Sequence, residues 1–355
     1  MTVMTTKERI TRMFEHRDAD RVPITDSPWS STLQRWHTEG LPEGMDFSDY
    51  FDLDKFADFS VDNSPRYPYE VLEDTEGYIV YKSGWGVTMK QWKNANSTPE
   101  FLEHTIVDYE TWKKAKELIT PTDDRIPWDY LKQNYKHFRD KGRWISAFLT
   151  FGFDATHAWI SGTERVLLAI AEDPDWLMDM FDHMLDICLK LYNRVWDAGY
   201  TFDSVSWCDD MGYKQNQFFS LNTYREILKP FHQRAIDWAH KKGIKAQLHS
   251  CGDINPFVPE LVSMGLDSLN PIEVKAGMNP VSLKKKFGDK LVLHGGVNAL
   301  LYEDVDAMCE EIKRILPVMK ENGGYIFSTD HSVPSTVSLE KFRKIVDTAK
   351  EYGKY

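Results

Sequence analysis

His249 and Cys251 lie two positions apart in the segment "QLHSCGD", and both residue types are good ligands for zinc. Residues i and i+2 of an extended strand point to the same side, so an imidazole and a thiolate at this spacing can bind one metal ion. A catalytic zinc also needs a third protein ligand and an open position for water or substrate. The candidates for the third ligand are His331, Asp330, Glu273 and His294. The alternative is a structural histidine beside a small, packed cysteine.

Three carboxylates also follow strand-like segments and are predicted to be catalytic. Asp209 and Asp210 follow "FDSVSWC", and Glu273 follows "LDSLNPI". A carboxyl group in such a position can act as an acid, a base or an orienting acceptor. The alternative for each is a loop carboxylate or a helix cap.

Three further residues are predicted to bind the substrate: His294, His157 and Trp29. His294 precedes two glycines, which permit close approach of the backbone to a ligand. His157 follows the strand-like "WISAFLTFGF". The N-terminal region is rich in tryptophan, and its aromatic side chains could form the wall of an apolar pocket. That idea requires Trp29, Trp36 or Trp85 to face the site.

Strand-like and helix-like segments, which must position these residues, alternate about six times from residue 144 onward. With one or two units before residue 144, eight units are expected, and this alternation is typical of a parallel sheet. We therefore predict an α/β fold, a (β/α)8 TIM barrel, with a doubly wound sheet as the alternative. No nucleotide-binding glycine motif follows a strand. In a barrel enzyme the carboxyl ends of the strands carry the chemistry, so these side chains would converge.

The chain is predicted to form a single barrel domain over residues 1–355, with an irregular N-terminal elaboration over about 28–125. A helix is expected over the first 20 or so residues, capped by Thr6, and a short strand at "DRVPITDS". The segment "YIVYKSGWGVTMKQW" is expected to form an antiparallel hairpin. The amphipathic stretch after residue 162 is expected to form two helices broken near Pro174.

Composition excludes several classes of protein. Lys and Arg total 43 against 55 Asp and Glu, a net charge of −12, which disfavours nucleic acid and anionic membranes as partners. A hydrophobic content of 42% with 12 Trp excludes disorder. We expect no membrane span, because no apolar run is long enough. The four cysteines form no disulfide framework and the first residues do not resemble a signal peptide, so we expect a cytoplasmic protein.

Several motifs resemble those of the uroporphyrinogen decarboxylase superfamily. In chain order they are "KERITRMFEHRDADRVPI", "DDMG", "LHSCGDI", "VLHGGVN" and "GGYIFSTDHSVP". The resemblance extends over about residues 7–350 and is weakest between 28 and 140. It implies a (β/α)8 barrel with one of two activities. One is the decarboxylase of the haem pathway, and the other is methyl transfer with zinc and a separate corrinoid protein.

The cobalamin-dependent methyltransferase branch is the better match. The decarboxylase signature includes an R-x-A-G-R stretch that binds the carboxylates of the substrate, whereas this chain reads "ITDSPWSSTLQRW" there. A chain of charge −12 also suits a substrate with eight carboxylates poorly. The branch holds zinc by an H-x-C pair, matched by His249 and Cys251, and by a late cysteine. His331, adjacent to Asp330, stands in the place of that cysteine.

The resemblance therefore implies a zinc enzyme that moves a methyl group between a small substrate and the cobalt of a corrinoid-binding partner. A methoxylated aromatic or another methyl ether is favoured, with Asp209, Asp210 or Glu273 protonating the leaving oxygen. The chain lacks a D-x-H-x-x-G motif, so a partner protein must supply the cobalamin. The alternatives are a decarboxylase, methyl transfer from methylcobalamin to a thiol or to tetrahydrofolate, and a binding protein without activity. The oligomeric state is open, with a homodimer as one option.

Overall fold

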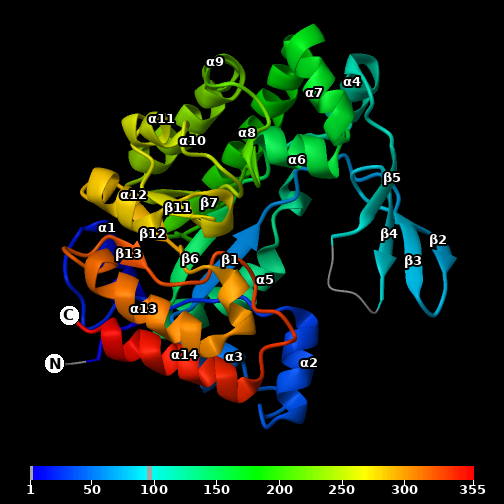
Figure 1. Ribbon diagram of the computed structural model, residues 1–355. Coiled ribbons are helices and arrows are strands. Elements are labelled where there is room, and N and C mark those ends of the chain that lie inside the picture. Colours follow the sequence, from blue (N-terminus) through cyan, green and yellow to red (C-terminus); the bar gives the residue numbers. More distant parts are fainter. Residues whose placement is uncertain (1–2, 94–97) are drawn as a thin grey trace.

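The computed structural model describes residues 3–93 and 98–355. Its central sheet curls into a barrel and is parallel throughout (Figure 1). In spatial order its strands are β1 (Phe56–Ser60), β6 (Trp144–Phe148), β7 (Ser204–Cys208), β10 (Lys245–His249), β11 (Ser268–Asn270), β12 (Val292–His294) and β13 (Tyr325–Ile326). Their order in space follows their order in the chain, as a singly wound barrel requires.

The extended segment 21–25 fills the eighth position and closes the barrel between β13 and β1. Ile24 forms a parallel bridge to Phe327, just after β13. On its other side, the Ile24 carbonyl accepts a hydrogen bond of 2.8 Å from the backbone N–H of Asp54, just before β1. This segment is the predicted "DRVPITDS" strand, and its position confirms the predicted barrel.

Helices surround the barrel (Figure 1). They are α1 (Thr6–Phe14), α2 (Ser30–Thr38), α3 (Phe47–Tyr50), α4 (Tyr109–Leu118), α5 (Trp128–Asp140), α6 (Gly152–Trp159), α7 (Thr163–Glu172), α8 (Pro174–Asp197), α9 (Leu221–Thr223), α10 (Lys229–Lys241), α11 (Val258–Ser263), α12 (Pro280–Phe287), α13 (Val305–Met319) and α14 (Leu339–Tyr352). The predicted break at Pro174 is confirmed, because Asp173 caps α8 there. Helix α1 is shorter than expected, and its cap is Thr5 rather than Thr6. Among the described residues, no helix is both long enough and apolar enough to cross a membrane.

The N-terminal elaboration contains a small antiparallel sheet that projects from the barrel (Figure 1). Its strands are β2 (Glu70–Asp74), β3 (Tyr78–Lys82), β4 (Val87–Trp92) and β5 (Glu100–His104). A separate short hairpin, outside the elaboration, pairs β8 (Gly212–Tyr213) with β9 (Asn216–Gln217). The predicted hairpin is confirmed as β3 and β4, with Gly86 at φ +77° in the turn. The elaboration is not continuous, because the barrel strand β1 lies inside the range 28–125 that the sequence assigned to it.

A buried ion cluster ties the closing segment to α1. The side chain of Asp54 has no exposed surface and accepts hydrogen bonds from Arg9 Nη1 at 2.9 Å and Arg21 Nη1 at 2.5 Å. It also accepts the backbone N–H of Ile24 at 2.8 Å. One carboxylate therefore joins the three parts of the chain that close the barrel.

We expect Asp54→Ala to lower the free energy of unfolding by about 3–5 kcal/mol, because two buried guanidinium groups lose a partner. Thermal unfolding followed by circular dichroism measures the effect. Asp129→Ala is the matched control, since that side chain is 90% exposed. An Asp54→Ala protein that melts with the wild type would contradict this role.

Candidate functional site

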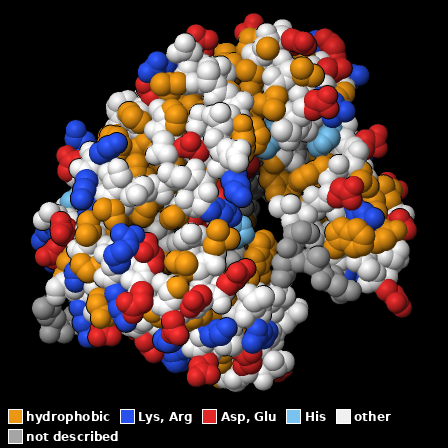
Figure 2. Space-filling view, viewed as in Figure 1, with side chains coloured by type: hydrophobic (Ala, Val, Ile, Leu, Met, Phe, Trp, Pro, Cys, Tyr) orange, Lys and Arg blue, Asp and Glu red, His pale blue; other side chains and the backbone are white. Residues whose placement is uncertain are grey.

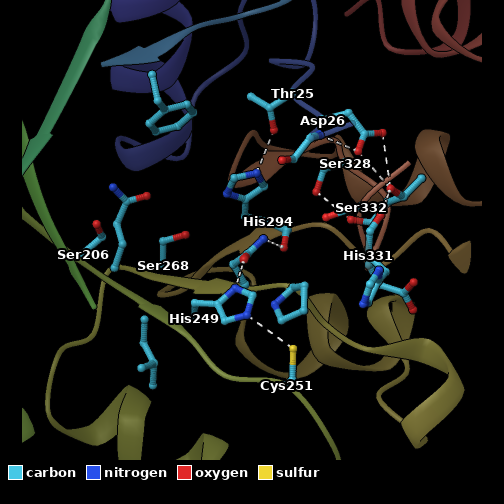
Figure 3. Close-up of a pocket in the computed structure, with 18 of the residues that line it drawn as sticks. Thr25, Asp26, Ser206, His249, Cys251, Ser268, His294, Ser328, His331 and Ser332 are labelled. Atoms are coloured by element: carbon cyan, nitrogen blue, oxygen red, sulfur yellow. Dashed lines mark hydrogen bonds between the residues drawn. The ribbon is translucent and has the colours of Figure 1, made fainter. Parts of the chain in front are cut away.

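A cavity of about 490 Å³ opens at the carboxyl ends of the barrel strands. His249, Cys251, His294 and His331 all face it (Figure 3). The molecular surface is hollowed between the barrel and the projecting sheet, and histidine side chains are visible at the margin of the hollow (Figure 2). Among the described residues, no Lys or Arg lines this cavity. The predicted convergence of strand-end residues on one pocket is thus present for these four.

His249 is oriented by the neighbouring strand. Its Nδ1 lies 2.5 Å from Oδ1 of Asn270 at the end of β11. The amide nitrogen of Asn270 donates to the His294 carbonyl at 3.1 Å, which leaves Oδ1 as the acceptor for an N–H on Nδ1. The lone pair of His249 is then on Nε2, which lies 3.3 Å from Sγ of Cys251. This is the arrangement in which a histidine binds a metal through one nitrogen and is held through the other.

Two more donors come close to His249 from the end of β7. Ligand atoms of Cys208, Asp210 and His249 all lie within 4.8 Å of one another. Oδ1 of Asp210 is 3.8 Å from Nε2 of His249 and accepts the backbone N–H of Cys251 at 2.7 Å. Burial and the charge of Asp210 raise the pKa of both cysteine thiols. Two thiols, a carboxylate and an imidazole are a donor set that zinc accepts, and a cation would offset the cost of ionising the thiols.

His331 stands apart from this group. It lies after β13 and lines the same cavity, with its ring 6.2 Å from that of Trp29. Among the described residues, the group of donors within 4.8 Å of one another contains His249, Cys208 and Asp210 but neither His331 nor Cys251. Cys251 still contacts His249 directly, with Sγ 3.3 Å from Nε2. The structure therefore brings together two of the three predicted ligands, His249 and Cys251, and adds Cys208 and Asp210 beside them.

Asp209 is directed toward His232 of α10, whereas the carboxylate of its neighbour Asp210 lies 3.8 Å from Nε2 of His249. Its carboxylate is fully buried, accepts the backbone N–H of Asp154 at 2.8 Å, and lies 2.8 Å from Nε2 of His232. Adjacent residues at a strand end face opposite sides, which explains the division. The catalytic role predicted for Asp209 is not supported by this position, and we regard it as a positioning residue. His232 of α10 is its partner.

Glu273 and Asp330 hold backbone around the cavity. Oε2 of Glu273 accepts the N–H of Gly252 at 2.6 Å, which supports the loop that carries Cys251. The two oxygens of Asp330 accept the N–H groups of Val274 and Ala299, each at 2.8 Å. Both carboxylates are already engaged, so they position the loops rather than reach a shared metal.

The residues predicted to bind substrate differ in placement. His294 lines the cavity, 2.9 Å from the Thr25 hydroxyl and stacked against Phe56, and burial lowers its pKa to about 4, so the ring is neutral at pH 7. Trp29 also lines the cavity. His157 instead stacks on Phe153 and is not among the described residues that line either cavity of this site.

A second cavity, of about 260 Å³, lies on the other side of Cys208. Its walls include Trp85 and Trp159, so part of the tryptophan-rich region does face the site. Trp36 does not, because it is fully buried in the core. Asp154 also lines this cavity, and burial together with Asp210 raises its pKa to about 7.

Comparison with known proteins agrees with this geometry at the level of the family. The family model of uroporphyrinogen decarboxylase (URO-D) matches residues 5–352. A protein named uroporphyrinogen decarboxylase from Protochlamydia amoebophila is 28% identical, over 50% of this chain and 46% of its own length. Another of that name, from Helicobacter pylori, is 30% identical, over 40% of this chain and 38% of its own length. One from Ruthia magnifica is 23% identical, over 52% of this chain and 51% of its own. The chain thus spans about half the length of the curated relatives it matches, or less.

A solved structure described as a methyltransferase from Methanosarcina mazei is similar over nearly the whole chain. The TM-score is 0.67, with 99% of both chains covered and 17% sequence identity. At this identity the likeness shows the fold, which agrees with the closed barrel described above.

Proposed function

The chain belongs to the uroporphyrinogen decarboxylase family, and on that premise we propose that it is a zinc-dependent methyltransferase of the cobalamin-dependent branch. It moves a methyl group between a small substrate, with a methoxylated aromatic or other methyl ether favoured, and the cobalt of a separate corrinoid protein. The observation that carries the proposal is a group of donors at His249. Ligand atoms of Cys208, Asp210 and His249 lie within 4.8 Å of one another, and Sγ of Cys251 lies 3.3 Å from Nε2 of His249.

Zinc held by this cluster would act as a Lewis acid on the ether oxygen of the methyl donor. Asn270 keeps Nε2 of His249 directed at the cluster, and Glu273 fixes the loop that presents Cys251. The leaving oxygen needs a proton. Asp154 would give it, because it lines the aromatic cavity beside Cys208 and its pKa is raised to about 7, whereas Asp210 would be ionised as a zinc ligand.

The other components of the proposal lie outside the chain. The cobalamin comes with a corrinoid-binding partner, because the sequence has no D-x-H-x-x-G motif. The four cysteines are free in the structure, which suits the reducing cytoplasm. The site involves no nucleic acid, and a homodimer is compatible with it but not required by it.

Decarboxylation of uroporphyrinogen is the alternative, and the names of the curated relatives favour it. The charge of the cavity opposes it. Asp26, Asp58 and Asp330 line the cavity, and no Lys or Arg does so among the described residues. A substrate with eight carboxylates would enter a site of the same charge, without the cations that such a substrate needs for binding.

A direct assay separates the two. We expect the purified protein to contain about one zinc per chain and to form methylcobalamin from cob(I)alamin and 4-methoxybenzyl alcohol. Plasma mass spectrometry measures the metal, and the absorbance spectrum follows the cobalamin. Methyl transfer from methylcobalamin to a thiol or tetrahydrofolate, without ether cleavage, would show that the substrate is a methyl acceptor and not a methyl ether. A metal-free protein that decarboxylates uroporphyrinogen would overturn the proposal.

A further inference from the structure

The interior of the barrel is polar one side-chain layer below the metal-binding cluster. Residues two positions apart on a strand share a face, and the residues two positions before Phe148, Cys208, His249 and Asn270 are Ser146, Ser206, Gln247 and Ser268. Asp58 of β1 pairs in register with Ser146 and faces the same barrel interior. All five line the main cavity. Barrels usually fill such layers with branched apolar side chains, so this layer is built for a polar ligand.

Some of these polar side chains form hydrogen bonds with one another. The hydroxyl groups of Ser146 and Ser206 are 3.1 Å apart, and Nε2 of Gln247 donates to the hydroxyl of Ser204 at 2.7 Å. This leaves Oε1 of Gln247 as an acceptor. The side chains of the layer are therefore partly hydrogen-bonded to one another, and the groups still available for hydrogen bonding are mainly acceptors.

Within the described residues, Ser268 and Asp58 have no partner for their polar groups. The Ser268 hydroxyl is buried and makes no hydrogen bond within the described part of the chain. Asp58 is exposed to the cavity and takes part in no hydrogen bond or ion pair among the described residues. Figure 3 shows Ser206 and Ser268 turned into the same cavity as His249. The buried, unpaired hydroxyl of Ser268 carries a free-energy cost that a bound ligand can remove, whereas the exposed carboxylate of Asp58 is accessible to a ligand.

The charge of the layer decides which ligand group fits. Partial desolvation inside the cavity raises the pKa of Asp58 to about 6, and its carboxyl group is still mostly ionised at pH 7. No cationic side chain lines the cavity in the described residues, so nothing in the protein neutralises it. An ammonium group offers a positive charge and three N–H donors to a layer made of one carboxylate and several neutral acceptors.

We propose that Asp58 binds an ammonium group of the methyl donor and makes the site selective for cationic over anionic substrates. The identity of the ligand as a methyl donor rests on the proposed function, but the charge selectivity does not. Asp58 and His249 line the same cavity, which is large enough for a ligand of one ring.

Three isosteric probes test this by calorimetric titration in the absence of cobalamin: 4-methoxybenzylamine, 4-methoxybenzyl alcohol and 4-methoxybenzoate. We expect the amine to bind the wild type about 10- to 100-fold more tightly than the alcohol, the range of a charge-assisted hydrogen bond, and the acid most weakly. Asp58→Asn should abolish the preference for the amine over the alcohol. Equal affinity for all three probes, or a preference that survives in Asp58→Asn, would overturn the proposal.

Asp26→Asn is the matched control within the cavity. The Asp26 carboxylate is already bonded to the hydroxyl groups of Thr329 at 3.0 Å and Tyr302 at 3.1 Å, so this variant should keep the preference for the amine. The melting curve of Asp58→Asn shows whether it is folded, and retained binding of the alcohol shows that its cavity is intact. A charge preference without methyl transfer from any probe would support Asp58 and refute the proposed activity. Methyl transfer without a charge preference would support the proposed activity and refute the role of Asp58.

Discussion

Replacing His249 with alanine should remove bound zinc from the protein and lower the rate of methyl transfer by about 1000-fold or more. His249 is the donor on which the cluster converges, with Cys251 at 3.3 Å and Asp210 at 3.8 Å from its Nε2. A Lewis acid lowers the barrier to cleaving the ether by several kcal/mol, and each 1.36 kcal/mol is a factor of ten in rate. Zinc content after dialysis and the formation of methylcobalamin are the two measurements.

His137→Ala is the control for this experiment, because that side chain is exposed on α5, remote in sequence from the cluster. It should retain both zinc and activity. If His249→Ala kept a full complement of zinc, the donor cluster would not be the metal site, and the proposed function would lose its main support.

The same measurement identifies the remaining ligand. If the metal binds where the donors gather, Cys208→Ser should lower zinc affinity while His331→Ala should retain it. The opposite result would restore the set of His249, Cys251 and His331 that the sequence predicts. In that case the loop after β13 must move toward Cys251 when the metal binds.

Substitutions of the two adjacent carboxylates after β7 should have different effects, one on stability and the other on zinc affinity. Asp209→Ala should lower the free energy of unfolding by about 3–5 kcal/mol, because it removes the partner of a fully buried histidine and of a backbone N–H. The Asp209 carboxylate is also closely packed, since a Cβ on Gly152 would lie 2.3 Å from its Oδ2. Asp210→Ala should change stability little and lower zinc affinity instead.

Urea unfolding followed by circular dichroism, combined with zinc analysis, checks both variants. Asp209→Asn should lie between the wild type and Asp209→Ala, because an amide oxygen can still accept the backbone N–H of Asp154. Loss of zinc without loss of stability in Asp209→Ala would contradict the positioning role. It would show instead that Asp209 acts in the site, as the sequence predicts.

The repeated strands and helices after residue 144 could be predicted from local patterns alone. Alternation of apolar strand-like and amphipathic segments depends on spacings of a few residues, and Pro174 and the Gly86 turn act equally locally. The strand β1 could not be found in this way. Its five residues "FADFS" contain a charged Asp58 that faces the barrel interior, so the segment lacks the apolar pattern of a barrel strand.

The sequence by itself determined the barrel, the strand ends as the place for chemistry, and the pairing of His249 with Cys251, because each follows from neighbours along the chain. Only the tertiary structure decided which other side chains meet there. Cys208 and Asn270 reach His249 through the register of β7 and β11 with β10, and His232 reaches Asp209 from α10. Register and closure depend on contacts between residues far apart in the chain. Local spacing therefore could not reveal that Asp210 faces the site, that Asp209 is buried, or that Asp58 is unpaired.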